Sequence, residues 1–247
     1  MSSDGYASSN SLLKSLHGDR VERQKNRRWE APEIFDFGAG EPLRLCSVPS
    51  MFLGAQFWSS GLAMARALSK GDHDLAGARC LELGAGLGLV GLAAARYLRA
   101  QKVVLSDLEE MQPLLQRNIE LNDMSGTCEA RTLVWGDALP EELETAFDVV
   151  LAADVIYPTT GGSLPLLLKT ILQLCPTGSS TQLLLAYQPR AREDQTFLNE
   201  ELLPHFDAVS RQTLLWYCSA LQICHYLTSN CHCKYFLLSE GHVQKCD

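Results

Sequence analysis

The strongest constraint on the fold is a regular alternation of short apolar runs and longer amphipathic segments through the middle of the chain. Hydrophobic periodicity predicts strands at 78–83, 102–106, 130–134, 148–152 and 181–187, and helices at 89–99, 108–122, 163–175 and 195–206. Strands separated by helices of this length form βαβ units, in which the strands run parallel. The sequence therefore predicts a doubly wound α/β fold, a mostly parallel sheet between two layers of helices.

Three segments precede this alternation. Residues 1–30 are polar with a local basic run, and we expect a flexible arm there. Apolar pieces around turn-forming residues predict a pair of strands within 34–46. Apolar residues at helical spacing predict a helix at 59–70 that ends at Gly71. Since the pattern does not break, we expect a single domain over 31–247.

Composition excludes several classes of protein. Of 247 residues, 46% are hydrophobic and 20% are charged, as in an average globular protein with a sizeable core. No apolar stretch approaches the roughly 20 residues that span a bilayer, and residues 1–10 lack the apolar segment of a secretory signal. The net charge of −8 argues against a nucleic-acid-binding surface. We therefore expect a cytoplasmic or nuclear monomer that binds neither membrane nor nucleic acid.

The nine cysteines fall into two groups. Cys46, Cys80, Cys128 and Cys175 are isolated, so we interpret them as buried free thiols. The others lie near the C-terminus, where a zinc site is conceivable from Cys224, His225, Cys231, His232 and Cys233. Structural zinc usually takes two ligand pairs at longer and more regular spacing. We therefore expect no metal.

A glycine-rich turn is the most informative motif. The first predicted strand of the alternation leads into Gly84, Ala85 and Gly86, then Gly88 and a helix, and Asp107 ends the next strand. Glycine lets the backbone turn sharply and approach a ligand, and Gly88 lets the helix pack near the strand. Asp107 is placed to accept hydrogen bonds from two ribose hydroxyls. The alternatives are a turn used only for packing and a dinucleotide site.

Two details favour S-adenosylmethionine over a nicotinamide cofactor. Glu82 lies inside the strand two residues before the first glycine, and the turn reads Gly-Ala-Gly-Leu-Gly and not G-x-G-x-x-G. Two tryptophans offer rings for such a cofactor: Trp135 follows the third strand and could lie against the adenine, while Trp58 precedes the first helix and could cover the site. The alternative for either ring is simple core packing.

The fourth strand ends with Asp154 and Tyr157. At the carboxyl end of a parallel sheet, where ligands bind, this carboxylate can attract and orient an ammonium, and the phenol can orient an amine or pack against its stem. Methyl transfer requires the neutral amine; a nearby sulfonium lowers the pKa of a lysine, whereas the charge of Asp154 works against deprotonation. The alternatives are a helix cap for Asp154 and a core aromatic for Tyr157.

Taken together, these residues resemble the lysine methyltransferase group of the seven-β-strand methyltransferases, methyltransferase family 16, over about 52–190. The resemblance rests on Trp58, 82–88, 107–110, Asn118, Asn122, 134–136 and 153–157, and Asp-x-x-Tyr at 154–157 is the group's signature. It implies a Rossmann-like seven-stranded sheet in three αβα layers, and S-adenosylmethionine as cofactor.

The resemblance also implies roles for individual residues. Those lining the cofactor would be Trp58, Gly84, Ala85, Gly86, Asp107, Trp135 and Ala153. Asp154 and Tyr157 would face the side-chain amine of a lysine in a protein substrate. Known substrates of the group suggest an AAA ATPase, a chaperone or a translation factor, and 104–122 and 163–172 look most similar to the type acting on the valosin-containing AAA ATPase.

Other functions remain open, because the C-terminal segment departs from the group. Its usual final hairpin is charged and alternating, whereas 210–247 is apolar and cysteine-bearing. Either strands at 213–218 and 234–238 still form, or the last pair is poorly formed. The alternatives to a lysine methyltransferase are a non-catalytic S-adenosylmethionine-binding interaction protein, a methyltransferase of protein arginine or small amines, and a nicotinamide oxidoreductase.

Overall fold

A seven-stranded sheet forms the centre of the computed structural model, which describes residues 31–48, 53–71, 73–144, 147–157, 162–206, 208–216 and 231–239. The strand order is β5-β4-β3-β6-β7-β9-β8. The first five strands of that order are parallel, and β9 joins β7 and β8 antiparallel. The strand bounds are β3 (Arg79–Leu83), β4 (Lys102–Asp107), β5 (Cys128–Thr132), β6 (Val149–Ala153), β7 (Gln182–Tyr187), β8 (Ala208–Trp216) and β9 (Cys231–Ser239).

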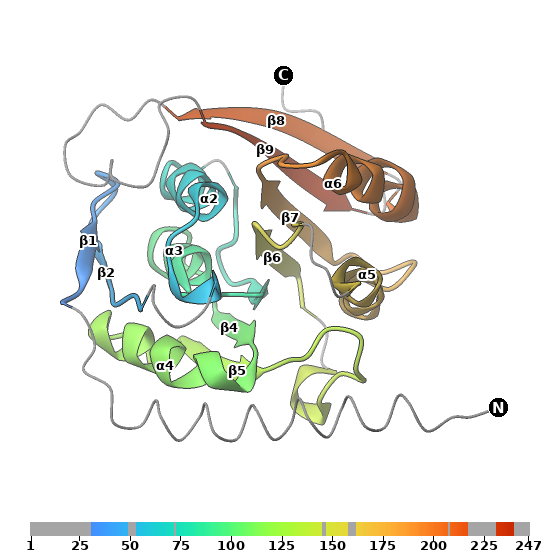
Figure 1. The fold of residues 1–247 in the computed structure, drawn as a ribbon. Helices are drawn as coiled ribbons and strands as arrows, with labels where there is room; N and C mark the ends of the chain where they lie inside the picture. The colour runs from blue at the N-terminus through green and yellow to red at the C-terminus, as the bar shows by residue number, and fades with distance from the viewer. Residues whose placement is uncertain are drawn as a thin grey trace.

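Helices cover both faces of this sheet, which confirms the predicted three-layer α/β fold (Figure 1). One face carries α2 (Ser59–Ser69), α3 (Leu89–Tyr97) and α4 (Gln112–Leu121), and the other carries α5 (Ser163–Leu174). Shorter turns are η1 (Leu53–Ala55), η2 (Glu109–Met111) and η3 (Glu141–Leu143). No helix among the described residues is long and apolar enough to cross a membrane.

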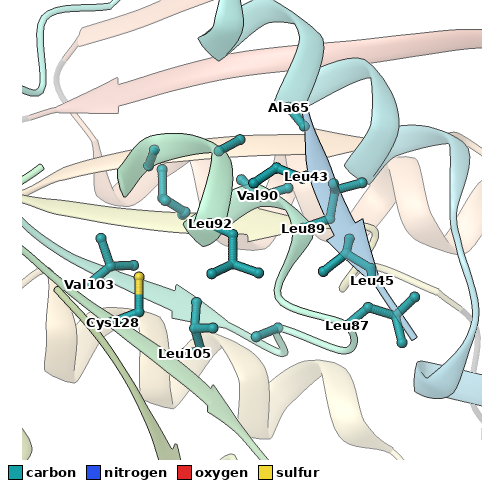
Figure 2. Packing of buried hydrophobic residues seen from close by; sticks show 14 of the residues in the cluster. Leu43, Leu45, Ala65, Leu87, Leu89, Val90, Leu92, Val103, Leu105 and Cys128 are labelled. Atoms are coloured by element: carbon teal, nitrogen blue, oxygen red, sulfur yellow. The ribbon is translucent and has the colours of Figure 1, made fainter. Parts of the chain in front are cut away.

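The two helical layers bury alternate residues of the same strands. Cys80 and Leu105 belong to the cluster under α2, α3 and α4, whereas Leu81 and Val104 belong to the cluster under α5. This follows from the two-residue period of a strand. Figure 2 shows the first cluster, in which side chains of α3 meet those of β4, β5 and the short strand β2 (Leu43–Leu45). The predicted buried thiols are confirmed for Cys46, Cys80, Cys128 and Cys175.

Three predicted elements differ from the structure. The strand predicted at 130–134 lies two residues earlier, because β5 pairs with β4 from Val103↔Cys128 to Asp107↔Thr132. The helix predicted at 108–122 divides into η2 and α4, with Pro113 in the first turn of α4, where its missing N–H is harmless. The helix predicted at 195–206 begins at Arg192 as α6 (Arg192–Thr196) and continues as the π-helix η4 (Phe197–Leu202) and the 3₁₀ turn η5 (Leu203–His205).

The predicted strand pair before the first helix is present as β1 (Glu33–Phe35) and β2 (Leu43–Leu45). Two asparagines one turn apart hold its edge, Asn118 of α4 and Asn122, the C-cap residue of that helix. Asn122 Oδ1 accepts from Arg44 N at 2.9 Å, and Asn118 Oδ1 accepts from Cys46 N at 2.8 Å. Both side-chain Nδ2 groups donate back to the carbonyls of the same two residues. The asparagines thus satisfy the edge of β2 as a neighbouring strand would.

The C-terminal segment supplies two paired strands, β8 and β9, which supports the first of the two alternatives given for it. Two residues of the conceivable zinc site, Cys224 and His225, lie outside the described residues. Cys218 and the predicted arm at 1–30 also lie outside them. Among the residues that the structure describes, no group of three or more His, Cys, Asp or Glu is arranged to hold a metal ion.

Candidate functional site

The glycine-rich turn lies at the carboxyl end of β3. Gly84, Gly86 and Gly88 have φ of +64°, +55° and +78°, the left-handed region that favours glycine. A Cβ on Gly84 would lie 3.0 Å from Val155 Cγ1, and one on Gly86 would lie 2.8 Å from the Gly54 carbonyl oxygen. The turn therefore needs glycine for its backbone conformation and for its close contacts within the protein.

Asp107 is fixed by this turn. Its Oδ2 accepts a hydrogen bond from Gly86 N at 2.7 Å, and its Oδ1 accepts from Leu108 N at 2.7 Å. Burial raises the pKa of Asp107 to about 6, against the opposing effect of these two backbone donors. A carboxylate has about four lone-pair positions, so both oxygens keep acceptor capacity for a diol.

Glu82 anchors the helix that follows the turn. Its Oε2 accepts from Gly91 N at 2.8 Å, and a Cβ on Gly91 would lie 2.8 Å from the same oxygen. Desolvation raises the pKa of Glu82 to about 8. Close packing of α3 on β3 and β4 thus requires a glycine at 91 and an acceptor at 82, a relation that the sequence does not reveal.

Trp135 lies against the turn from the side of α5. Its Cζ2 would be 3.1 Å from a Cβ on Gly84, and the side chain is only partly buried. The backbone after it is held by α5: Gly136 N donates to Thr170 Oγ1 at 2.8 Å, and Lys169 Nζ donates to the Gly136 carbonyl at 2.6 Å. The ring therefore stands beside the glycine-rich turn with part of its surface available.

Asp154 is held by Arg190, a residue that no motif in the sequence indicates. Asp154 follows β6 directly, with φ of +60°, and its N donates to the Ala186 carbonyl at 2.8 Å. Arg190 Nη1 donates to Asp154 Oδ1 at 2.8 Å and Nη2 to Oδ2 at 2.7 Å. The Asp154 side chain is 3% exposed and that of Arg190 is 30% exposed. The carboxylate therefore serves an ion pair, and among the described residues it caps no helix.

Trp58 joins the same cluster. The Arg190 guanidinium carbon lies 5.3 Å from the centroid of the Trp58 ring, within reach of a cation–π interaction. Ser59 Oγ also donates to Gln188 Oε1 at 2.8 Å, which ties the start of α2 to the residues after β7. The sequence indicates Arg190 only by its position, as a charged residue shortly after the carboxyl end of a predicted strand.

Tyr157 and Ala153 complete the predicted set. Tyr157 is partly buried; burial raises the pKa of its hydroxyl, and the charge of Asp107 adds to that shift. Ala153 ends β6 and is paired with Ala186 of β7. The structure thus brings Gly84, Trp135 and Asp107 together around the turn, and Trp58 and Asp154 together through Arg190.

Solved structures of methyltransferases share this fold. The chain matches the delta-N METTL16 methyltransferase domain with a TM-score of 0.55 at 15% identity, over 82% of this chain and 90% of that chain. A methyltransferase from Pyrococcus furiosus gives a TM-score of 0.50 at 17% identity, over 73% and 84%. At these identities the likeness concerns the fold alone.

The family follows from the sequence match. Residues 42–202, more than half of the chain, match the family described as lysine methyltransferase, Methyltransf_16. The chain belongs to this family, as its motifs indicated.

Curated relatives carry matching names. The chain is 36% identical to protein-lysine N-methyltransferase EFM6 of Saccharomyces cerevisiae, over 49% of this chain and 54% of the yeast protein. It is 33% identical to protein N-lysine methyltransferase METTL21A of Danio rerio, over 60% and 66%. With EEF1A lysine methyltransferase 3 of Xenopus tropicalis it shares 29% identity, over 68% and 74%. The chain thus spans about half to two thirds of the first two of these proteins.

Proposed function

We propose that the protein transfers a methyl group from S-adenosylmethionine to the side-chain amine of a lysine in a protein substrate. One observation carries the proposal: in a chain of the lysine methyltransferase family, the Asp107 carboxylate is bound to Gly86 N of the left-handed turn after β3. A ribose acceptor and a close-approaching backbone are the two features that an adenosyl cofactor needs at this position.

The residues present fit such a cofactor. Asp107 would accept from the ribose hydroxyls, and Gly84, Ala85 and Gly86 would let the backbone approach. The partly exposed Trp135 ring, Trp58 and Ala153 would border the cofactor. S-adenosylmethionine supplies an electrophilic methyl group on a sulfonium and needs no metal, so the protein's part is alignment and exclusion of water.

Asp154 and Tyr157 would face the acceptor amine. A phenol titrates near 10 and burial raises the pKa of Tyr157 further, so its hydroxyl keeps its proton at neutral pH and is able to donate a hydrogen bond or accept one from the amine. Neither residue offers a nucleophile to the methyl group; each orients the lone pair of the lysine nitrogen.

A translation factor is our first choice of substrate, because one relative is named a methyltransferase of EEF1A. An AAA ATPase or another chaperone stays as the second choice. The net charge of −8 suits a basic segment around the target lysine. We further propose that the protein acts as a monomer in the cytoplasm, and also in the nucleus.

The test is methyl transfer from labelled S-adenosylmethionine to proteins of a cell lysate. We would compare the wild type with Asp154→Ala and with Arg192→Gln, a control at an exposed arginine. The proposal predicts discrete labelled bands with the wild type and the control, strongly reduced bands with Asp154→Ala, and methyllysine after hydrolysis. Methylarginine, or label only in small molecules, would replace lysine as acceptor. Cofactor binding without any label would favour a non-catalytic binding protein.

A further inference from the structure

The ion pair between Asp154 and Arg190 bears on how an acceptor lysine becomes reactive. A lone buried carboxylate at the acceptor position would attract an ammonium and keep it protonated, because opposite charges within about 4–6 Å favour the charged form by 1–3 pKa units. A protonated lysine has no lone pair with which to attack a methyl group. The proposed reaction therefore requires that this charge be offset.

The position of Arg190 allows it to offset the charge of Asp154. Its two terminal nitrogens engage both oxygens of Asp154 at 2.8 and 2.7 Å, the bidentate geometry of strong arginine–carboxylate pairs. The guanidinium also lies 5.3 Å from the Trp58 ring centroid, and its own backbone N donates to Asp194 Oδ2 at 3.0 Å. Held at these points, the arginine is a fixed partner of Asp154.

We propose that Arg190 is a positioning residue that neutralises Asp154, so that the acceptor lysine is held as the neutral amine. This inference rests on the proposed function. The nitrogen lone pair forms the new N–C bond while the S–C bond breaks, and the electron pair of that bond stays on sulfur as a neutral thioether. The nitrogen, now positively charged, gives its surplus proton to solvent. Asp154 keeps lone pairs that orient the amine, without its net charge.

Other titratable groups of this region include Tyr157 after β6, Asp107 at the end of β4, whose charge acts on Tyr157, and Asp194 of α6. Asp107 lies with the glycine-rich turn, and Asp194 accepts from the backbone N of 190 and 191. None of these three groups is a cation, whereas Arg190 contacts both oxygens of Asp154 and balances its charge.

The first test is the pH dependence of methyl transfer. The variants are Arg190→Gln, Arg190→Lys, the double variant Asp154→Asn with Arg190→Gln, and the exposed control Arg192→Gln. With Arg190→Gln we expect the pH at which the rate rises to move up by about one unit, with about a tenfold loss at pH 7 that is recovered at high pH. In Arg190→Lys and in the double variant, the rate should again rise at the pH seen for the wild type. Arg192→Gln should not change that pH.

The second test measures binding and does not depend on catalysis. The probe is n-butylamine, protonated at pH 7, titrated by NMR into each folded variant. Arg190→Gln should bind it at least about tenfold more tightly than the wild type, because its Asp154 is unpaired, and the double variant should lose this gain. Thermal melts establish that each variant is folded.

The outcomes separate the inference from the proposed function. The inference would be overturned if Arg190→Gln lost rate at every pH, with the rate still rising at the wild-type pH, and gained no affinity for butylammonium. Arg190 would then be a structural residue only. If the wild type transfers no methyl group at all, the proposed function fails, and the butylammonium titration alone decides whether Arg190 masks the charge of Asp154.

Discussion

The two sides of the candidate site are built in different ways. Around the turn after β3, backbone groups make the contacts: Gly86 N donates to Asp107, Gly91 N donates to Glu82, and the Gly54 carbonyl lies beside Gly86. At the ends of β6 and β7 the contacts are made by side chains, with Arg190 between Asp154 and Trp58. The first side suits recognition of a constant cofactor. On the second side Trp58 would also border the cofactor, whereas the Asp154–Arg190 pair suits adjustment to a particular acceptor.

The comparison predicts that backbone changes at the turn have the largest effect. Gly86→Ala would place a Cβ 2.8 Å from the Gly54 carbonyl in a left-handed conformation, so we expect cofactor affinity to fall by about 100-fold or more. The matched control is Gly61→Ala in α2, where the added Cβ meets nothing within 4 Å. Calorimetric titration with S-adenosylmethionine would measure both. Equal affinity of the two variants for S-adenosylmethionine would contradict the assignment of the turn to cofactor binding.

Next in size is the effect of Asn118→Ala on stability. Asn118 is fully buried and its side chain makes three hydrogen bonds, two to Cys46 just after β2 and one to the Leu87 carbonyl, and so links the end of β2 to the turn. Leaving these groups unsatisfied should lower the free energy of unfolding by about 2–3 kcal/mol. Urea denaturation would measure it, beside Asn199→Ala, an exposed asparagine with one hydrogen bond. A cost below about 0.5 kcal/mol would contradict the link.

A smaller effect is expected from pH on cofactor binding. The pKa of Asp107 is raised to about 6, so the carboxylate is ionised at pH 7 and takes up a proton as pH falls through 6. A protonated carboxyl loses acceptor capacity for the ribose, so we expect roughly tenfold weaker binding at pH 5 than at pH 7. Asp107→Asn should bind weakly at both pH values. A wild-type affinity that does not change with pH would sink the ribose assignment.

The smallest predicted effect concerns Glu82. Its pKa is raised from 4.5 to about 8, so the folded state binds more protons than the unfolded state between these values, and stability falls as pH rises through that window. Between pH 7 and 8 the loss should be about 1 kcal/mol. Glu82→Gln keeps an oxygen acceptor for Gly91 N and should remove this loss, whereas the exposed Glu120→Gln should not. Parallel stability curves for wild type and Glu82→Gln would contradict the assignment.

The same comparison explains what the sequence could predict. The turn, Glu82 and Asp107 come from one stretch of two strands and a helix, so their spacing along the chain carries the geometry, and the alternation of elements predicted the sheet. The Arg190 pair joins residues 36 apart, and its ring contact reaches back to Trp58 before α2. No local pattern encodes such a meeting, because it depends on how β6, β7 and α2 converge.

The predicted bounds of two elements are wrong for a similar reason. Apolar periodicity placed β5 two residues late, since its ends are set by pairing with β4. Apolar spacing predicts one helix at 195–206, but the structure divides 192–205 into α-, π- and 3₁₀-helical turns, the last with Pro204 in it. Tertiary packing, and not local propensity, decides where such elements end.

The central claim is that one side of the site binds the cofactor and the other handles the acceptor. The most direct test is to measure S-adenosylmethionine affinity and methyl-transfer rate together for Asp154→Asn and the wild type. The account predicts that cofactor affinity stays within about twofold while transfer falls at least about tenfold. A parallel loss of both, or unchanged transfer, would contradict the division between the two sides.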